Sequence, residues 1–270
     1  SAARLRGAHV AFDMSTVNGT QNVMMAAVLA EGRTVIENAA REPEVAELSQ
    51  LLTAMGARVH GAGSDRIEIE GVARLSGVDH SVWGDRIEVG TLLAAGMITR
   101  GAVCVRGADA ALLDATLEKL RDAGAEVTVN GDAITLRADE PPRGIRVVTA
   151  PYPGFPTDMQ AQLMAALTLA DGSSVVTETV FENRYMHVPE LVRMGADIEV
   201  TGRAAHVRGV RQLSGAPVMA TDLRASAGLI LAGLAAEGET VVNRVYHIDR
   251  GYERIEDKLR RLGAEIRREG

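Results

Sequence analysis

The chain has 270 residues, a formal net charge of -7, and 46% hydrophobic but only 3% aromatic residues. The negative charge and the scarcity of aromatic side chains argue against a nucleic-acid partner. A single cysteine, Cys104, excludes an internal disulfide and a cysteine-based zinc site. Because no apolar run of about 18 residues and no signal-type start is present, we expect a soluble cytoplasmic protein without a membrane partner.

Two glycine markers divide the chain into four repeated units. A glycine that closes a predicted helix recurs at spacings of 69, 71 and 66 residues, at Gly32, Gly101, Gly172 and Gly238. A Gly-Ala pair recurs at spacings of 68, 71 and 68 residues, beginning at Gly56, Gly124, Gly195 and Gly263. Two independent markers with nearly the same period predict a repeat protein.

Each unit shows the same order of predicted elements. A helix closed by glycine leads to a β-branched strand, such as 34–36, and a second helix closed by Gly-Ala leads to two short alternating strands, such as the one at 66–69. Pro43 and Pro189 stand where a helix tolerates proline in its first turn. The sequence therefore predicts an α/β fold built of α+β repeats, in which each unit needs neighbours to cover its helices.

We expect a domain boundary between the first and second units. Residues 1–84 would then be one unit of a first domain, and residues 85–270 three units of a second domain. Only seven residues follow Gly263, so the fourth unit is expected to lack its closing strand. We expect a partner to supply it, either a missing N-terminal part of the same chain or a second copy.

The segment 151–172 is the one most suited to chemistry. Its Pro- and Gly-rich loop leads into a helix start where Thr157 and Gln160 form a capping-box pattern and Asp158 falls in the first turn. Asp158 could be a general base that accepts a proton from a substrate hydroxyl. The structural alternative is an acidic residue that balances the helix dipole, and Asp85 and Asp222 occupy similar places.

Four arginines lie in such loops or first turns, at Arg86, Arg184, Arg224 and Arg250. Arginine at a helix N-terminus opposes the dipole and needs a compensating anion. That anion is either a neighbouring aspartate, as in Asp249-Arg250, or a phosphate or carboxylate ligand bound by converging guanidinium groups. Cys104 aligns with the predicted strands of other units and is expected to be a core thiol. No histidine spacing predicts a metal site, and no nucleotide-binding or catalytic-triad motif is present, so no cofactor is expected.

Four segments carry a family resemblance: PGFPTDMQAQ, TETVFENRYMHVPEL, ATDLRASAGLILAGLAAEGETVV and YHIDRGYERIEDKLRRLGA. With them, the chain resembles the UDP-N-acetylglucosamine 1-carboxyvinyltransferase family over essentially all of its residues, which would correspond to the C-terminal two thirds of a member. The resemblance implies the inside-out α/β barrel-like enolpyruvyl transferase fold, with four of its six repeat units present. It also implies transfer of the enolpyruvyl group from phosphoenolpyruvate to the 3-hydroxyl of UDP-N-acetylglucosamine with release of phosphate, the first committed step of peptidoglycan synthesis.

The resemblance also implies roles for individual residues. The catalytic group would be Asp158 as the base, Asp222 near the reacting centre and Arg250 on phosphoenolpyruvate. Substrate contacts would come from the set Ser15, Thr16, Val17, Asp158, Val180, Arg224 and Arg250. Met14 stands where the family often has lysine.

The family's cysteine-bearing loop and its early lysine and arginine would precede Ser1, and Cys104 does not replace that cysteine. We therefore expect the segment alone to be inactive. Two alternatives remain: a non-catalytic repeat module, which would bind a sugar nucleotide or anion or serve as a protein scaffold, and an enolpyruvyl transferase for another acceptor.

Overall fold

The computed structural model describes residues 4–269 and divides the chain into two compact units. Unit 1 runs to Trp83 and includes Pro151–Pro153, and unit 2 contains Gly84–Ala150 and the residues from Gly154 onward. No helix in the described part of the chain is long and apolar enough to cross a membrane.

Unit 1 holds one complete repeat with a four-stranded sheet. Its elements are β1 His9–Ala11, α1 Val17–Ala27, β2 Arg33–Glu37, α2 Pro43–Ala54, β3 Arg58–His60 and β4 Arg66–Glu70. The strand order is β1-β2-β4-β3, in which β1 is parallel to β2 and the other pairs are antiparallel. Met24 of α1, Ile36 of β2 and Ile67 of β4 are fully buried in the core between the helices and the sheet.

Unit 2 holds the other three repeats. The first has α3 Arg86–Ile98, β5 Ala102–Arg106, η1 Ala110–Leu113, α4 Asp114–Asp122, β6 Glu126–Asn130 and β7 Ala133–Arg137. The second has β8 Arg146–Val148, η2 Thr157–Met159, α5 Gln160–Leu167, β9 Ser173–Thr177, α6 Val188–Arg193, β10 Asp197–Thr201 and β11 Ala204–Arg208. The third has β12 Leu213–Ser214, β13 Pro217–Met219, α7 Leu223–Ala235, β14 Ala236–Glu237, β15 Val241–Asn243, η3 Val245–Arg250 and α8 Ile255–Arg261.

The sheets repeat one topology. The order β8-β9-β11-β10 in unit 2 matches the order in unit 1, and β5-β7-β6 is the same arrangement without the first strand. Among the described residues of the last repeat, only β13 and β15 pair in this pattern, and β12 pairs with β14. The predicted order of elements is thus confirmed, while the short strands that precede α1, α5 and α7 are absent from the sequence prediction.

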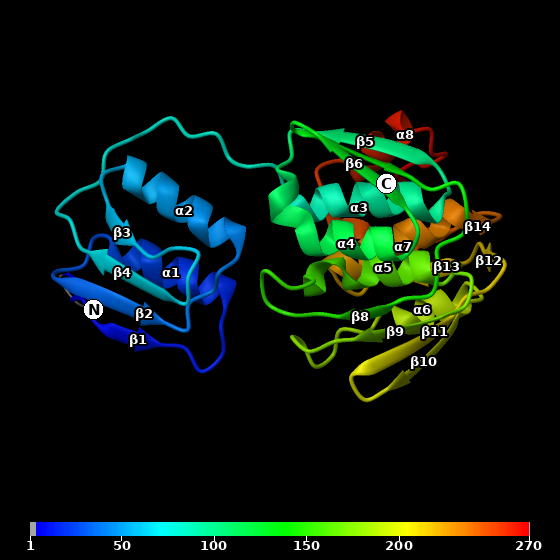
Figure 1. The fold of residues 1–270 in the computed structure, drawn as a ribbon, viewed down its shortest axis with the longest axis horizontal. Helices are drawn as coiled ribbons and strands as arrows, with labels where there is room; N and C mark the ends of the chain where they lie inside the picture. Colours follow the sequence, from blue (N-terminus) through cyan, green and yellow to red (C-terminus); the bar gives the residue numbers. More distant parts are fainter. Residues whose placement is uncertain (1–3, 270) are drawn as a thin grey trace. The chain divides into compact units, whose positions relative to one another are not determined.

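Three helices form the centre of unit 2. The helices α3, α5 and α7 pack against one another, with the β5–β7 sheet against α3 and the β9–β11 sheet against α5 (Figure 1). Every residue of α5 is buried, and most of α3 and α7 is buried as well. A helix that is apolar on all sides belongs inside a protein. The helices therefore lie inside and the sheets outside.

The backbone conformation explains why glycine recurs at the helix ends. The glycine of each Gly-Ala pair has a φ between +95° and +102°, a left-handed conformation that glycine adopts without a steric penalty at a helix end. Gly101 is the exception among the first set of markers, since its preceding residue Arg100 takes the positive φ of 53° instead.

The prediction of a core thiol is wrong for Cys104. The residue lies on β5 as expected, but its side chain is exposed, whereas Val103 beside it is buried. Successive side chains of a strand point to opposite faces, so a shift of one position moves a side chain from the core to solvent. Cys104 aligns with Val35 and Val175, which are only partly buried, and the buried positions on those strands are the neighbours on either side, at Thr34, Ile36, Ser174 and Val176.

Candidate functional site

The starts of α3 and α7 are capped by aspartate. Asp85 accepts hydrogen bonds from the backbone N–H groups of Ile87 and Glu88. Asp222 does the same for Arg224 and Ala225, at 2.8 and 2.9 Å. A carboxylate at this position satisfies the unpaired amides of the first turn and complements the helix dipole. The capping alternative is therefore observed for these two aspartates.

The start of α5 is built differently. A 3₁₀ turn, η2, precedes the helix, and neither element has a side-chain cap. The expected capping box is wrong, because the hydroxyl of Thr157 donates to the carboxylate of Glu178 at 2.9 Å rather than accepting from the helix backbone. The carboxylate of Asp158 is thus left for partners outside its own helix.

Two arginines from different segments hold Asp158. Arg184, in the loop between β9 and α6, donates from Nη2 to Oδ1 at 2.7 Å. Arg224, in the first turn of α7, donates from Nη2 to Oδ2 at 3.1 Å. The side chains of Arg184 and Arg224 are only 17% and 14% exposed, while that of Asp158 is 38% exposed. The carboxylate is therefore held on one side and open to solvent on the other.

The charges set the protonation states of this group. Burial opposes ionisation of Asp158, but the charges and hydrogen bonds of Arg224 and Arg184 outweigh it, so the pKa of Asp158 lies below its ordinary value of 3.8. For Arg224, burial lowers the pKa and the Asp158 carboxylate more than offsets this, so its pKa is raised. The site at neutral pH is one carboxylate between two guanidinium ions, with a net positive charge that suits an anionic ligand.

A buried hydrogen-bond network holds the guanidinium of Arg224. Arg224 Nη1 donates to the hydroxyl of Tyr252 at 3.3 Å, and Gln162 Nε2 lies 3.1 Å from the same oxygen. Because both of these groups are donors, the Tyr252 hydroxyl accepts from them and gives its own proton to Thr91 Oγ1, 2.8 Å away. Thr91 in turn donates to the carbonyl oxygen of Ile87. The network therefore connects α3, α5 and α7 on the buried side of the Asp158 site.

Two other predicted site residues of unit 2, Val180 and Arg250, form no hydrogen bond or ion pair with Asp158, Arg184 or Arg224 among the described residues. Val180 lies in the loop after β9, where its N–H donates to Glu178. Arg250 ends η3 and is exposed, and among the described residues it forms no hydrogen bond or ion pair. The expected alternative of pairing with the preceding aspartate does not hold for Arg250, because Asp249 pairs with Arg268.

Ser15, Thr16 and Val17 lie at the start of α1 in unit 1. Thr16 caps the helix, accepting from the N–H of Gly19 at 3.3 Å. Ser15 is exposed, as is the side chain of Met14 before it. Helix capping is a sufficient structural role for Thr16, so the local structure by itself requires no ligand here.

Sequence reasoning overlooked the residues that hold the site. Gln162 and Tyr252 lie in segments that carry the resemblance but were given no role there, and Thr91 lies in no such segment. Glu178 gave no signal beyond its place in TETVFENR. A polar residue at a core-facing position of a helix does indicate that it has a hydrogen-bond partner, which is the one signal that could have indicated Gln162.

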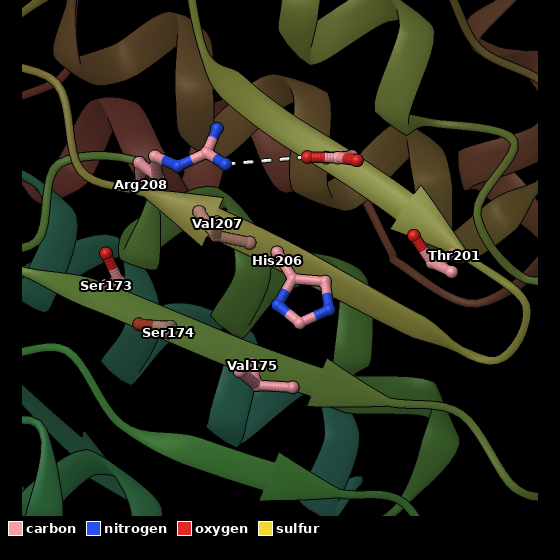
Figure 2. Close-up of a pocket in the computed structure, with 8 residues that line it drawn as sticks. Ser173, Ser174, Val175, Thr201, His206, Val207 and Arg208 are labelled. Carbon is pink, nitrogen blue, oxygen red and sulfur yellow. Dashed lines mark hydrogen bonds and ion pairs between the residues drawn. The ribbon is translucent and has the colours of Figure 1, made fainter.

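A shallow hollow elsewhere in unit 2 does not resemble this site. It lies on the outer face of the sheet formed by β9, β10 and β11, where His206 and Arg208 project from β11 (Figure 2). Arg208 is paired there with Glu199 and Asp197 on β10. Within residues 4–269, no group of three or more histidine, cysteine, aspartate or glutamate side chains is arranged to hold a metal ion.

Comparisons with known proteins agree with one another. The family model described as EPSP synthase (3-phosphoshikimate 1-carboxyvinyltransferase) matches residues 1–259. A UDP-N-acetylglucosamine 1-carboxyvinyltransferase from Anaeromyxobacter sp. (strain Fw109-5) is 62% identical over 266 residues, which are 98% of this chain and 63% of the relative. The chain thus spans less than two thirds of that relative's length.

Solved structures show the same fold. The enolpyruvyl transferase NikO from Streptomyces tendae superposes with a TM-score of 0.89 at 27% identity, over 99% of this chain and 66% of that protein. An EPSP synthase from Acinetobacter baumannii superposes with a TM-score of 0.75 at 19% identity, over 98% of this chain and 64% of that protein. The expected enolpyruvyl transferase fold is confirmed.

Proposed function

Because the chain belongs to the EPSP synthase family, we propose that it forms part of an enzyme that transfers the enolpyruvyl group from phosphoenolpyruvate to the 3-hydroxyl of UDP-N-acetylglucosamine, with release of phosphate. The 62% identity to a relative named for this acceptor supports the choice of substrate. The observation that carries the proposal is the Asp158 carboxylate held between Arg184 and Arg224 at the start of α5.

The reaction needs both an acid–base group and an anion site. In the first step the acceptor oxygen adds to C2 of phosphoenolpyruvate while C3 gains a proton. In the second step the tetrahedral intermediate loses a proton from C3 and phosphate from C2. An ionised carboxylate at the acceptor hydroxyl can take the proton that this hydroxyl loses. Guanidinium groups stabilise the negative charge on the phosphate and carboxylate throughout. Asp158 would act as the base for the acceptor hydroxyl, and the two arginines would form the anion site.

The three charged groups also explain how Asp158 could become a better base. A carboxylate with both oxygens hydrogen-bonded to arginine is ionised but weakly basic. An anionic substrate that takes donors from Arg184 or Arg224 would remove stabilisation from the carboxylate, and the pKa of Asp158 would rise towards its ordinary value. In this proposal substrate binding activates the base.

The remaining predicted roles are part of the same proposal. Asp222 would line the reacting centre while capping α7, and Arg250 would bind phosphoenolpyruvate through its unpaired guanidinium. Val180 and the segment 15–17 would contact the sugar nucleotide. Residues 1–84 and 85–270 would belong to the two lobes of the enzyme.

An assay of phosphate release tests the proposal. Phosphoenolpyruvate and UDP-N-acetylglucosamine are supplied to the purified chain alone, and to the chain mixed with the part of the Anaeromyxobacter relative that it does not match. The proposal predicts phosphate release by the mixture and none by the chain alone, with loss of the release on Asp158→Asn substitution. Absence of turnover in both samples, together with no measurable binding of UDP-N-acetylglucosamine, would contradict it and favour a repeat module with another role.

A second acceptor is the other candidate, and the family model that matches residues 1–259, which is named for 3-phosphoshikimate, favours testing it. The same assay with shikimate 3-phosphate in place of the sugar nucleotide separates the two. Turnover with shikimate 3-phosphate and none with UDP-N-acetylglucosamine would identify a transferase for a different alcohol.

A further inference from the structure

Glu178 is a buried carboxylate at the end of β9 that no catalytic role accounts for. Its side chain is 1% exposed. Oε1 accepts from the hydroxyl of Thr149 at 2.8 Å and from the backbone N–H groups of Val180 and Phe181 at 2.8 and 3.1 Å. Oε2 accepts from the hydroxyl of Thr157 at 2.9 Å. These four hydrogen bonds compensate the burial of the carboxylate.

The partners of Glu178 adjoin the charged site on two sides. Thr157 directly precedes Asp158 in the η2 turn. Phe181 lies in the loop that carries Arg184, and the guanidinium of Arg184 lies 4.9 Å from the centre of the Phe181 ring. The two segments meet again at the 2.7 Å contact between Arg184 and Asp158. Glu178 is thus the common anchor of both partners of that ion pair.

We propose that Glu178 is a positioning residue, whose carboxylate fixes the turn bearing Asp158 and the loop bearing Arg184 relative to each other. The importance of this role for catalysis rests on the proposed function. The positioning itself rests only on the hydrogen bonds of Glu178. Arg224 has a separate support in Tyr252, so loss of the Glu178 anchor should affect the Arg184 contact more than the Arg224 contact.

Thr157→Val is the sharpest probe, because it removes one hydroxyl without changing the side-chain shape. The readout is the ¹⁵N NMR signal of the Arg184 side-chain Nε–H, assigned by its absence in Arg184→Lys protein. We expect the signal to broaden or disappear in Thr157→Val, since a loosened ion pair exchanges with water, while the Arg224 signal persists. Thr168→Val is the matched control, because its buried hydroxyl donates to Ala165 within the end of α5 and does not contact Glu178.

Substitutions of Glu178 itself provide a second test. In Glu178→Gln, the amide oxygen can replace Oε1 and the amide nitrogen can donate to a reoriented Thr157 hydroxyl, so the Arg184 signal should be retained. In Glu178→Ala it should be lost. An unchanged Arg184 signal in folded Thr157→Val protein, or an equal loss in the Thr168→Val control, overturns the proposal. If Glu178→Ala does not fold, the comparison of Thr157→Val with Thr168→Val tests the proposal on its own.

Kinetics separate this proposal from the proposed function. In the phosphate-release assay, Thr157→Val should lower kcat by about 10-fold to 100-fold, because displacements near 1 Å at a reacting group have effects of this size. The KM for UDP-N-acetylglucosamine should change little, since the loop at Val180 keeps its bonds to Glu178. The expected NMR changes, with no turnover by any protein in the mixture and no binding of UDP-N-acetylglucosamine, would support the positioning role and contradict the proposed function. An unchanged kcat in active Thr157→Val protein would contradict the positioning role.

Discussion

Arg224 donates a hydrogen bond to Asp158 at 3.1 Å although 66 residues separate them along the chain. That separation is close to the repeat period, so the two residues start equivalent helices in successive repeats. The packing of α3, α5 and α7 brings these helix starts together. The charged site is therefore a direct product of the repeated fold.

Removal of the Tyr252 hydroxyl tests the buried network. Tyr252→Phe removes the acceptor of Arg224 Nη1 and the donor to Thr91 Oγ1, while Gln162 Nε2 keeps the Asp158 carbonyl oxygen and Thr91 Oγ1 as acceptors. Loss of these buried bonds costs about 1–3 kcal/mol of unfolding free energy. Urea denaturation measures the loss. Tyr246→Phe is the control, because Tyr246 is 56% exposed, and its effect should stay within about 0.5 kcal/mol. Equal effects of the two substitutions would show that the network contributes nothing.

His187 predicts a pH dependence of stability. Its side chain is fully buried at the start of α6, and burial lowers its pKa from 6.5 to about 4, with Asp222 opposing the shift and Arg184 adding to it. Between these values the unfolded chain binds a proton that the folded chain does not. Stability is therefore complete above about pH 6.5 and falls as the pH drops towards 4.

The size of the His187 effect follows from the shift. Each pH unit below 6.5 costs about 1.4 kcal/mol, so the wild type should lose about 2 kcal/mol more than His187→Gln between pH 7 and pH 5. Urea unfolding at both pH values measures this difference. His206→Gln, on the exposed face of β11, should follow the wild type. Parallel pH profiles of wild type and His187→Gln would contradict the burial of an uncharged imidazole.

The exposed thiol of Cys104 should react without unfolding. A thiol reagent that releases a coloured product should label one cysteine per chain in native buffer, and Cys104→Ser should remove the reaction. Because the side chain faces solvent on β5, Cys104→Ser should change the unfolding free energy by no more than about 0.5 kcal/mol. Labelling that requires urea would place the thiol in the core after all.

The repeat pattern predicted the fold because it depends on local rules. Glycine ends a helix through its left-handed backbone, and alternation marks a strand, so Gly56, Gly195 and β4 follow from short stretches of sequence. The short strands β1, β8 and β13 could not be predicted in this way. Each has three residues and is defined as a strand only by its pairing with β2, β9 or β15.

The site could be predicted only in part. Asp158 and Arg224 each stand at a helix start, which sequence reasoning can locate, but their pairing depends on how the helices pack. Cys104 shows the limit of alignment by repeats, since one position along a strand decides between core and solvent. Glu178 binds Thr149 and Thr157, and Tyr252 binds Thr91, Gln162 and Arg224, all far away in sequence, and no local pattern encodes such partners.

Titration of the Asp158 carboxyl by ¹³C NMR tests the central claim most directly. The ionised carboxylate between Arg184 and Arg224 should titrate below 3.8 in the wild type, and Arg224→Gln or Arg184→Gln should each raise its pKa, because each substitution removes a positive charge that stabilises the carboxylate. A wild-type pKa at or above the ordinary value, unchanged by either substitution in folded protein, would show that the three charges do not form one site.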